Sequence, residues 1–129
     1  MKKEFVNYNQ ALKLKAIGFD EPCFGFYLED GTWTPASYSR EGTVYPSNTD
    51  LLPEWCAAPL YQQAFRWFRE KYQLQSEILW ITDMNCFWYK TGKFKYSSRD
   101  LSKDDYKTYE EAELACLDKL IEIVEQNQQ

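Results

Sequence analysis

The chain has 129 residues, of which 44% are hydrophobic, 18% aromatic and 27% charged, with a net charge of −5 and an isoelectric point near 4.8. This length predicts one domain, large enough to bury a core without disulfides or metal ions. The acidic balance argues against broad nucleic-acid binding and against an anionic membrane as the main partner.

Cysteine usage and the first residues predict a cytoplasmic protein without a metal or cofactor. No run is as long as a membrane-spanning helix, and the first ten residues lack the apolar core of a signal peptide. Cys23, Cys56, Cys86 and Cys116 form no CxxC pair, and the chain contains no histidine. A structural zinc site therefore lacks its usual ligands, and we expect reduced, mostly buried thiols.

The first predicted element is a helix over residues 8–17. Asn7 and Gln10 have the form of a capping box, in which each side chain accepts a hydrogen bond from the other residue's backbone. Gly18 followed by Phe19 is typical of a helix C-terminus with a glycine in the left-handed conformation and a hydrophobic closing contact.

A β-hairpin follows, with Asp30-Gly31 as a two-residue type I′ turn. In that register one face of the hairpin carries Phe24, Phe26, Leu28 and Trp33. Residues 35–58 then lose all periodicity, and contain three prolines among many polar residues. Their apolar content is too high for disorder, so we expect a long packed loop with a short strand near residues 43–45.

Residues 59–72 predict the helix around which the core is organised. Its apolar residues recur at the spacing of one helical face. They are Tyr61, Ala64, Phe65, Phe68 and Tyr72.

A strand over residues 76–82 and a second hairpin around Thr91-Gly92 follow. The register of this hairpin stays open between two alternatives. A two-residue turn unites Phe87, Tyr89, Phe94 and Tyr96 on one face. A three-residue loop instead places Cys86 and Trp88 beside Phe94 and Tyr96.

The last predicted helix begins after Thr108, ends near Glu125 and leaves a frayed tail over residues 126–129. Each of the three predicted helices starts with the pattern Tyr-x-[Gln/Glu]-Ala, which we interpret as recurrent capping chemistry. The fold class is therefore α+β, with three helices packed on a mostly antiparallel sheet of about five strands made of two hairpins and one strand.

The chain lacks the residue sets that common catalytic mechanisms require. Without histidine there is no Ser-His or Cys-His pair, and no glycine-rich phosphate loop occurs. The sequence therefore predicts a protein that is not an enzyme. Because tryptophan, tyrosine and arginine are enriched at binding hot spots, the aromatic surplus favours a protein partner or self-association. Trp67, with Arg66 and Arg69, forms one candidate contact patch, although Trp67 also fits the edge of a wide core face.

A second candidate site combines lysines with aromatic residues near the second hairpin. Residues 87–107 carry six basic and three acidic residues, whereas residues 108–129 carry six acidic and one basic. Trp88 or Tyr89 could stack on bases while Lys90, Lys93, Lys95 and Arg99 contact phosphates. The order helix-strand-strand-strand-helix over residues 60–125 is similar to the double-stranded RNA-binding domain. That domain requires basic residues at the start of its last helix, where this chain has Glu110, Glu111 and Glu113.

Three segments carry a resemblance to a known group of sequences: EFVNYNQALKLKAIGFDEPCFGFY, APLYQQAFRWFREKY and TYEEAELACLDKLIEIV. In this order they resemble an uncharacterised family of small proteins from gut Bacteroidota genomes and their phages or mobile elements. The family brings no activity, cofactor or catalytic residue to carry over. The resemblance implies an accessory protein of a phage or mobile element in the host cytoplasm. The favoured function is thus non-enzymatic protein binding, and nucleic-acid contact through the Lys90, Lys93 and Lys95 patch is the alternative.

Overall fold

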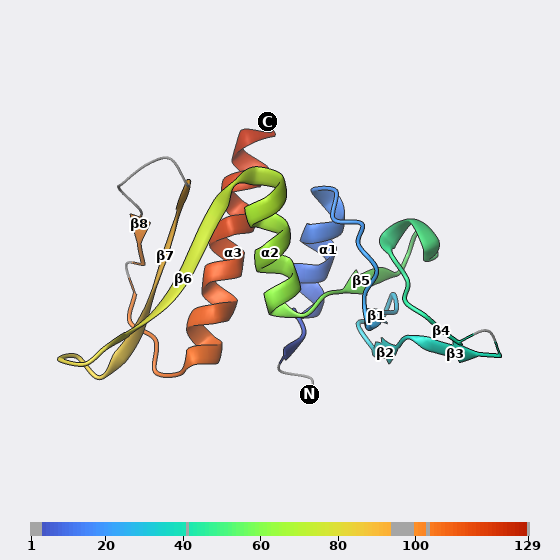
Figure 1. The fold of residues 1–129 in the computed structure, drawn as a ribbon, viewed down its shortest axis with the longest axis horizontal. Helices are drawn as coiled ribbons and strands as arrows, with labels where there is room; N and C mark the ends of the chain where they lie inside the picture. Colours follow the sequence, from blue (N-terminus) through green and yellow to red (C-terminus); the bar gives the residue numbers. More distant parts are fainter. Residues whose placement is uncertain (1–3, 41, 94–99, 103, 129) are drawn as a thin grey trace. The chain divides into compact units, whose positions relative to one another are not determined.

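The computed structural model describes residues 4–40, 42–93, 100–102 and 104–128 (Figure 1). The chain divides into two compact units, residues 1–61 and residues 62–129. Three helices and several antiparallel strands confirm the α+β class. In the described residues the strands are distributed over three small sheets, with orders β2-β1-β5, β3-β4 and β6-β7-β8. The single domain expected from the length stays a prediction.

In the first unit, helix α1 (Tyr8–Ala16) begins and ends as its sequence predicts. The Asn7 side chain accepts a hydrogen bond from the Gln10 N–H at 2.8 Å, and the Gln10 side chain accepts one from the Asn7 N–H. Beyond the helix Gly18 has a positive φ of 103°, and the Phe19 N–H bonds back to a carbonyl of the last turn. Both ends of the helix are therefore fixed by local hydrogen bonds.

The first hairpin joins β1 (Gly25–Tyr27) to β2 (Trp33–Pro35), one residue out of the predicted register. Tyr27 lies opposite Trp33, so the prediction that Trp33 shares a face with Phe24, Phe26 and Leu28 is wrong. Gly25 makes this arrangement feasible, because a Cβ at Gly25 would come within 2.6 Å of the Trp33 ring.

The shift originates in the turn, which has three residues rather than two. The Gly31 N–H bonds to the Leu28 carbonyl, the Leu28 N–H bonds to the Thr32 carbonyl, and Gly31 has a φ of 85°. A type I′ turn would require a positive φ at Asp30 as well, which is costly for a residue with a side chain. The Asp30 carboxylate instead accepts a hydrogen bond from the Thr32 N–H at 2.9 Å.

Residues 35–58, predicted as a packed loop, contain more regular structure than expected. They form β3 (Ser37–Ser39), β4 (Gly42–Val44), the short 3-10 helix η2 (Asn48–Asp50) and β5 (Cys56–Ala58). The Asn48 side chain donates to the Phe19 carbonyl at 2.7 Å and accepts from the Ala57 N–H at 2.8 Å. Strands of three residues are too short for an alternating pattern to reveal, which explains why the sequence predicted only one of them.

Helix α2 (Tyr61–Tyr72) carries the predicted stripe into the interior of the protein. Ala64, Phe65 and Phe68 are buried, as is Tyr61, while Tyr72 is half-buried. The helix ends at Gln73, which adopts a positive φ of 58°.

The sheet of the second unit consists of β6 (Leu74–Ile81), β7 (Cys86–Lys93) and β8 (Asp100–Leu101). β6 and β7 pair along their whole length across a turn at residues 82–85. The hairpin predicted around Thr91-Gly92 is wrong, because β7 runs straight through these residues and pairs next with β8. The predicted partners Phe94 and Tyr96 lie outside the described residues. The partner strand β6 supplies a continuous ladder, which favours extended backbone over a turn.

Helix α3 (Tyr109–Asn127) packs on β6 and β7 (Figure 1), and the described residues of this unit have the order α-β-β-β-α with β8 as the third strand. The Thr108 side chain caps it by accepting the Glu111 N–H at 3.1 Å. The helix continues to Asn127, two residues past the predicted end. Its buried face is formed by Ala112, Cys116, Leu117, Leu120, Ile121 and Val124.

All four cysteines are free and buried, as predicted. Burial raises the pKa of the Cys56 thiol to about 11 and that of Cys116 to about 12. Within the described ranges, no helix combines the length and apolar character needed to cross a membrane.

Candidate functional site

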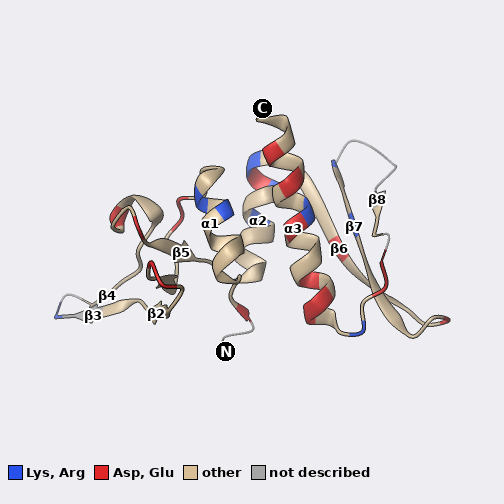
Figure 2. Cartoon of the chain, turned by 180° about the vertical axis from the view of Figure 1, so that it is seen from behind, with Lys and Arg blue, Asp and Glu red and all other residues tan. Residues whose placement is uncertain are grey.

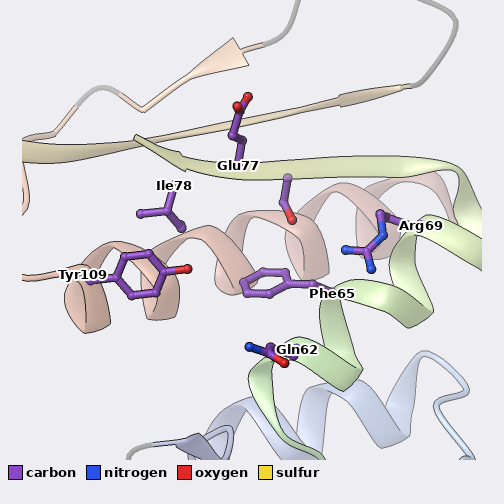
Figure 3. A pocket seen from close by; sticks show the side chains of 7 residues that line it. Gln62, Phe65, Arg69, Glu77, Ile78 and Tyr109 are labelled. Carbon is purple, nitrogen blue, oxygen red and sulfur yellow. The ribbon is translucent and has the colours of Figure 1, made fainter. Parts of the chain in front are cut away.

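A pocket of about 240 Å³ opens between α2, β6 and the start of α3, all within the second unit (Figure 3). Arg69 and Tyr109 point toward the Phe65 ring from opposite sides. In the same view Gln62 lies below that ring. The residues that line the pocket are Gln62, Phe65, Arg69, Ser76, Glu77, Ile78 and Tyr109.

Helical and strand periodicity bring these residues together. Gln62, Phe65 and Arg69 are spaced by three and four positions, so they follow one stripe of α2. Ser76 and Ile78 alternate with Glu77 along β6, and Figure 3 shows the Glu77 carboxylate directed away from the helices. The pocket therefore has an apolar base of Phe65 and Ile78 under a rim of polar groups.

Four of the polar side chains that line the pocket have no hydrogen-bond or ion-pair partner among the described residues. Within the described part of the chain, no hydrogen bond or ion pair engages the side chains of Gln62, Arg69, Ser76 or Tyr109. Each of these groups can therefore bond to a bound molecule without losing an internal partner.

The charges near the pocket differ between its two sides. The Arg69 guanidinium supplies a positive charge on one side. On the other side, burial and the neighbouring Glu113 and Glu110 carboxylates raise the pKa of Tyr109 above its ordinary value of 10. Tyr109 is therefore a neutral hydroxyl at physiological pH and can donate a hydrogen bond.

Tyr109 also ends a row of three aromatic side chains. Phe87 makes edge-to-face contacts with Trp80 and Tyr109, with ring centroids 4.9 Å and 6.0 Å away. Trp80 and Tyr109 are 50% and 46% exposed, so both rings present apolar area to solvent. We call Trp80, Phe87 and Tyr109 the aromatic row; it adjoins the pocket through Tyr109.

The predicted contact patch on α2 is divided by the structure. Arg69 lines the pocket, and Arg66 is exposed elsewhere on the helix. Trp67 is only 6% exposed and contacts the Phe68 and Tyr72 rings, so this structure places it in the core rather than on a contact surface. Lys71 lies over the Trp67 ring at 5.1 Å. This position agrees with the alternative that Trp67 lies at the edge of a wide core face, since the apolar face of α2 extends beyond the predicted stripe.

The predicted aromatic residues of β7 point to opposite faces of the sheet. The Trp88 indole N–H donates to the Asp105 carboxylate at 2.7 Å. Tyr89 lies on the other face beside Tyr106, and burial raises its pKa to about 12. The two rings therefore do not form one stacking surface of the kind that binds successive bases of a single strand.

The predicted basic patch is likewise divided. Lys90 and Lys93 are three positions apart on β7, so strand alternation places them on opposite faces. The Lys93 ammonium donates to the Tyr72 carbonyl at 3.2 Å. Lys95 and Arg99 lie outside the described residues.

Sequence reasoning missed most of the pocket. Gln62 lies outside the predicted apolar stripe of its helix, Tyr109 was interpreted as part of capping chemistry, and Ser76 and Ile78 carry no local signal. Only tertiary packing brings the start of α3 next to β6. The repeated tyrosine at helix starts was the one available hint.

The described residues contain no group of three or more His, Cys, Asp or Glu side chains that could hold a metal ion. Comparison with protein-family models, curated proteins and solved structures finds no match to this chain.

Proposed function

We propose that this protein is a non-enzymatic binding protein that holds a segment of another protein in the pocket and against the adjoining aromatic row. The observation that carries the proposal is the set of four polar pocket side chains that make no hydrogen bond or ion pair within the described chain, together with the exposed rings of Trp80 and Tyr109. Arginine, tryptophan and tyrosine are the residues that dominate the energetics of protein interfaces.

The size of the pocket supports a protein segment over a small-molecule substrate. Clefts that enclose drug-sized ligands typically have volumes of about 300–1,000 Å³. At about 240 Å³ this pocket is smaller, and fits one side chain of a partner. The exposed Trp80 and Tyr109 rings extend the contact area beyond the pocket itself.

The resemblance to small proteins of gut Bacteroidota phages and mobile elements supports an accessory role of this chain in such an element. In this proposal the chain is an accessory protein that acts in the host cytoplasm by binding another protein. A second copy of the chain is one such partner.

Nucleic-acid contact through the lysine patch receives less support. Lys90 and Lys93 lie on opposite faces of the sheet, and the first turn of α3 is acidic (Figure 2). A backbone-binding surface needs basic groups gathered on one side.

Photo-crosslinking tests the protein-binding proposal. p-Benzoylphenylalanine replaces Trp80 in the full chain, and a control chain carries it in place of Phe24, which is 53% exposed in the first unit. In host cells we expect a defined adduct from position 80 that is absent from position 24. Mass spectrometry then identifies the partner, and a second copy is recognised by its mass.

Affinity for the purified partner completes the test. Tyr109→Ala and Trp80→Ala each remove an exposed ring, and we expect each to weaken binding by about tenfold or more. Arg66→Gln changes an exposed residue outside the pocket and should leave affinity unchanged. A partner that binds both alanine variants as tightly as the natural chain would show that this surface is not the interface.

A further inference from the structure

We infer that the pocket recognises a single carboxylate of its partner, an acidic side chain or a chain terminus, through the Arg69 guanidinium. The inference rests on the proposed protein-binding function and specifies the chemistry of the group that enters the pocket. It follows from the charge, the hydrogen-bond donors and the apolar base of the pocket.

Arg69 is a half-buried cation for which the described chain provides no ion pair. It sits on the pocket-facing stripe of α2 and points toward the Phe65 ring (Figure 3). A guanidinium presents a planar fork of N–H donors that matches the two oxygens of a carboxylate. Partial burial strengthens such a pair relative to one in open solvent.

The other polar groups of the pocket complement a carboxylate and its neighbouring atoms. The Gln62 amide and the Ser76 and Tyr109 hydroxyls can all donate hydrogen bonds, and they flank the same cavity. The Tyr109 hydroxyl is protonated at physiological pH and can therefore act as a donor. Phe65 and Ile78 provide an apolar base for the carbon atoms next to the bound carboxylate.

The acidic residues near Tyr109 restrict the charge of the ligand. Glu110 and Glu113 lie within one helical turn of Tyr109 on α3, so their carboxylates oppose additional negative charge at that side of the pocket. A carboxylate carries one negative charge, which Arg69 can neutralise. A phosphate monoester carries about two and would leave an unbalanced charge next to these residues. The pocket therefore favours a carboxylate over a phosphorylated group.

Nuclear magnetic resonance on the ¹⁵N-labelled full chain tests this chemistry with three small probes. They are N-acetyl-phenylalanine, its primary amide, and phenyl phosphate. We expect the carboxylate to shift the Arg69 side-chain Nε–H signal and the Tyr109 amide signal, with a Kd on the order of 1 mM for so small a molecule. The amide and the phosphate should bind at least about tenfold more weakly.

Two arginine variants on the same helix provide matched controls. Arg69→Gln keeps a polar side chain but removes the charge, and it should abolish the Tyr109 shift. Arg66→Gln should leave the shift unchanged. Equal binding of the amide, tighter binding of the phosphate, or a response to the carboxylate that survives Arg69→Gln would each overturn the inference.

The source of the carboxylate and the proposed function are tested separately with the crosslinked partner. Partner peptides with Asp or Glu changed to the amide, and peptides with an amidated C-terminus, distinguish a side chain from a chain terminus. A partner that depends on Trp80 and Tyr109 but not on Arg69 would overturn the carboxylate inference and leave protein binding intact. No dependence on any of the three would overturn both.

Discussion

Ser76 and Thr91 lie opposite each other on β6 and β7, and their side chains share one face of the sheet. Ser76 lines the pocket, whereas Thr91 is 1% exposed and its hydroxyl has no hydrogen-bond partner in the described chain. The polar lining of the pocket thus continues into the interior of the unit. Such a buried, unsatisfied hydroxyl destabilises the folded state.

Thr91→Val should therefore stabilise the protein. Valine has the same branched shape and suits a strand, but it removes the hydroxyl that loses its hydration on folding. We expect the free energy of unfolding to rise by about 1 kcal/mol in urea titrations. Thr82→Val, in the exposed turn between β6 and β7, is the control and should change stability by less than about 0.5 kcal/mol. A loss of stability in Thr91→Val would indicate that the hydroxyl has a partner in solution.

Lys15 should be a structural residue of the first unit despite its charge. Its ammonium donates to the Pro53 carbonyl at 2.6 Å and to the Trp55 carbonyl at 2.8 Å, and so fixes the segment before β5 to α1. Lys15→Met should lower the free energy of unfolding by about 1–3 kcal/mol, because hydrogen bonds from charged donors are stronger than neutral ones. Lys13→Met changes an exposed lysine of the same helix and should have little effect. Equal effects of the two substitutions would refute the assignment.

Helix ends could be predicted because their signals are local. The Asn7 capping box and the Gly18 C-terminus each depend on residues that are close in sequence, and both form as predicted. Turns were predicted less accurately, and the single register predicted for Asp30-Gly31 is wrong, because Asp-Gly and Thr-Gly pairs fit more than one backbone path. A three-residue turn forms at Gly31, whereas Gly92 lies within the continuous strand β7 and forms no turn. Pairing with a neighbouring strand decides these cases, and that information is not local.

The candidate site was predictable only in part for the same reason. Arg69 was identified because its type is enriched at interfaces, but the pocket needs β6 and the start of α3 beside it. Trp67 carried an equally strong signal by type and is buried. Composition therefore identified which residue types could bind, and tertiary packing decides which of them face a pocket.

The end of α2 offers a stabilising substitution. Gln73 adopts a φ of 58°, in the left-handed region that is unfavourable for residues with a Cβ. Gln73→Gly removes that strain, and after the entropic cost of glycine we expect a gain of about 0.5–1 kcal/mol in the free energy of unfolding. Asn85 has a similar φ of 55°, but asparagine tolerates this region. Asn85→Gly should therefore gain less, and a larger gain at position 85 would contradict the argument.

Stability at alkaline pH should depend on Cys116. Burial first, and then the Glu113 carboxylate, raise the pKa of this thiol from about 9 to about 12. The folded protein therefore retains a proton that the unfolded chain releases. This contribution to stability is complete below pH 9 and declines as the pH rises from 9 toward 12.

Cys116→Ala isolates this effect, since it removes one titrating thiol from the buried face of α3. Between pH 9 and 10 the free energy of unfolding of the natural chain should fall more steeply than that of the variant. The difference approaches about 1.4 kcal/mol per pH unit, the value for one proton. Cys23→Ala retains Cys116 and should keep the steeper fall. Urea titrations at closely spaced pH values measure the slopes, and identical slopes for the natural chain and Cys116→Ala would mean that the thiol does not hold its proton when folded.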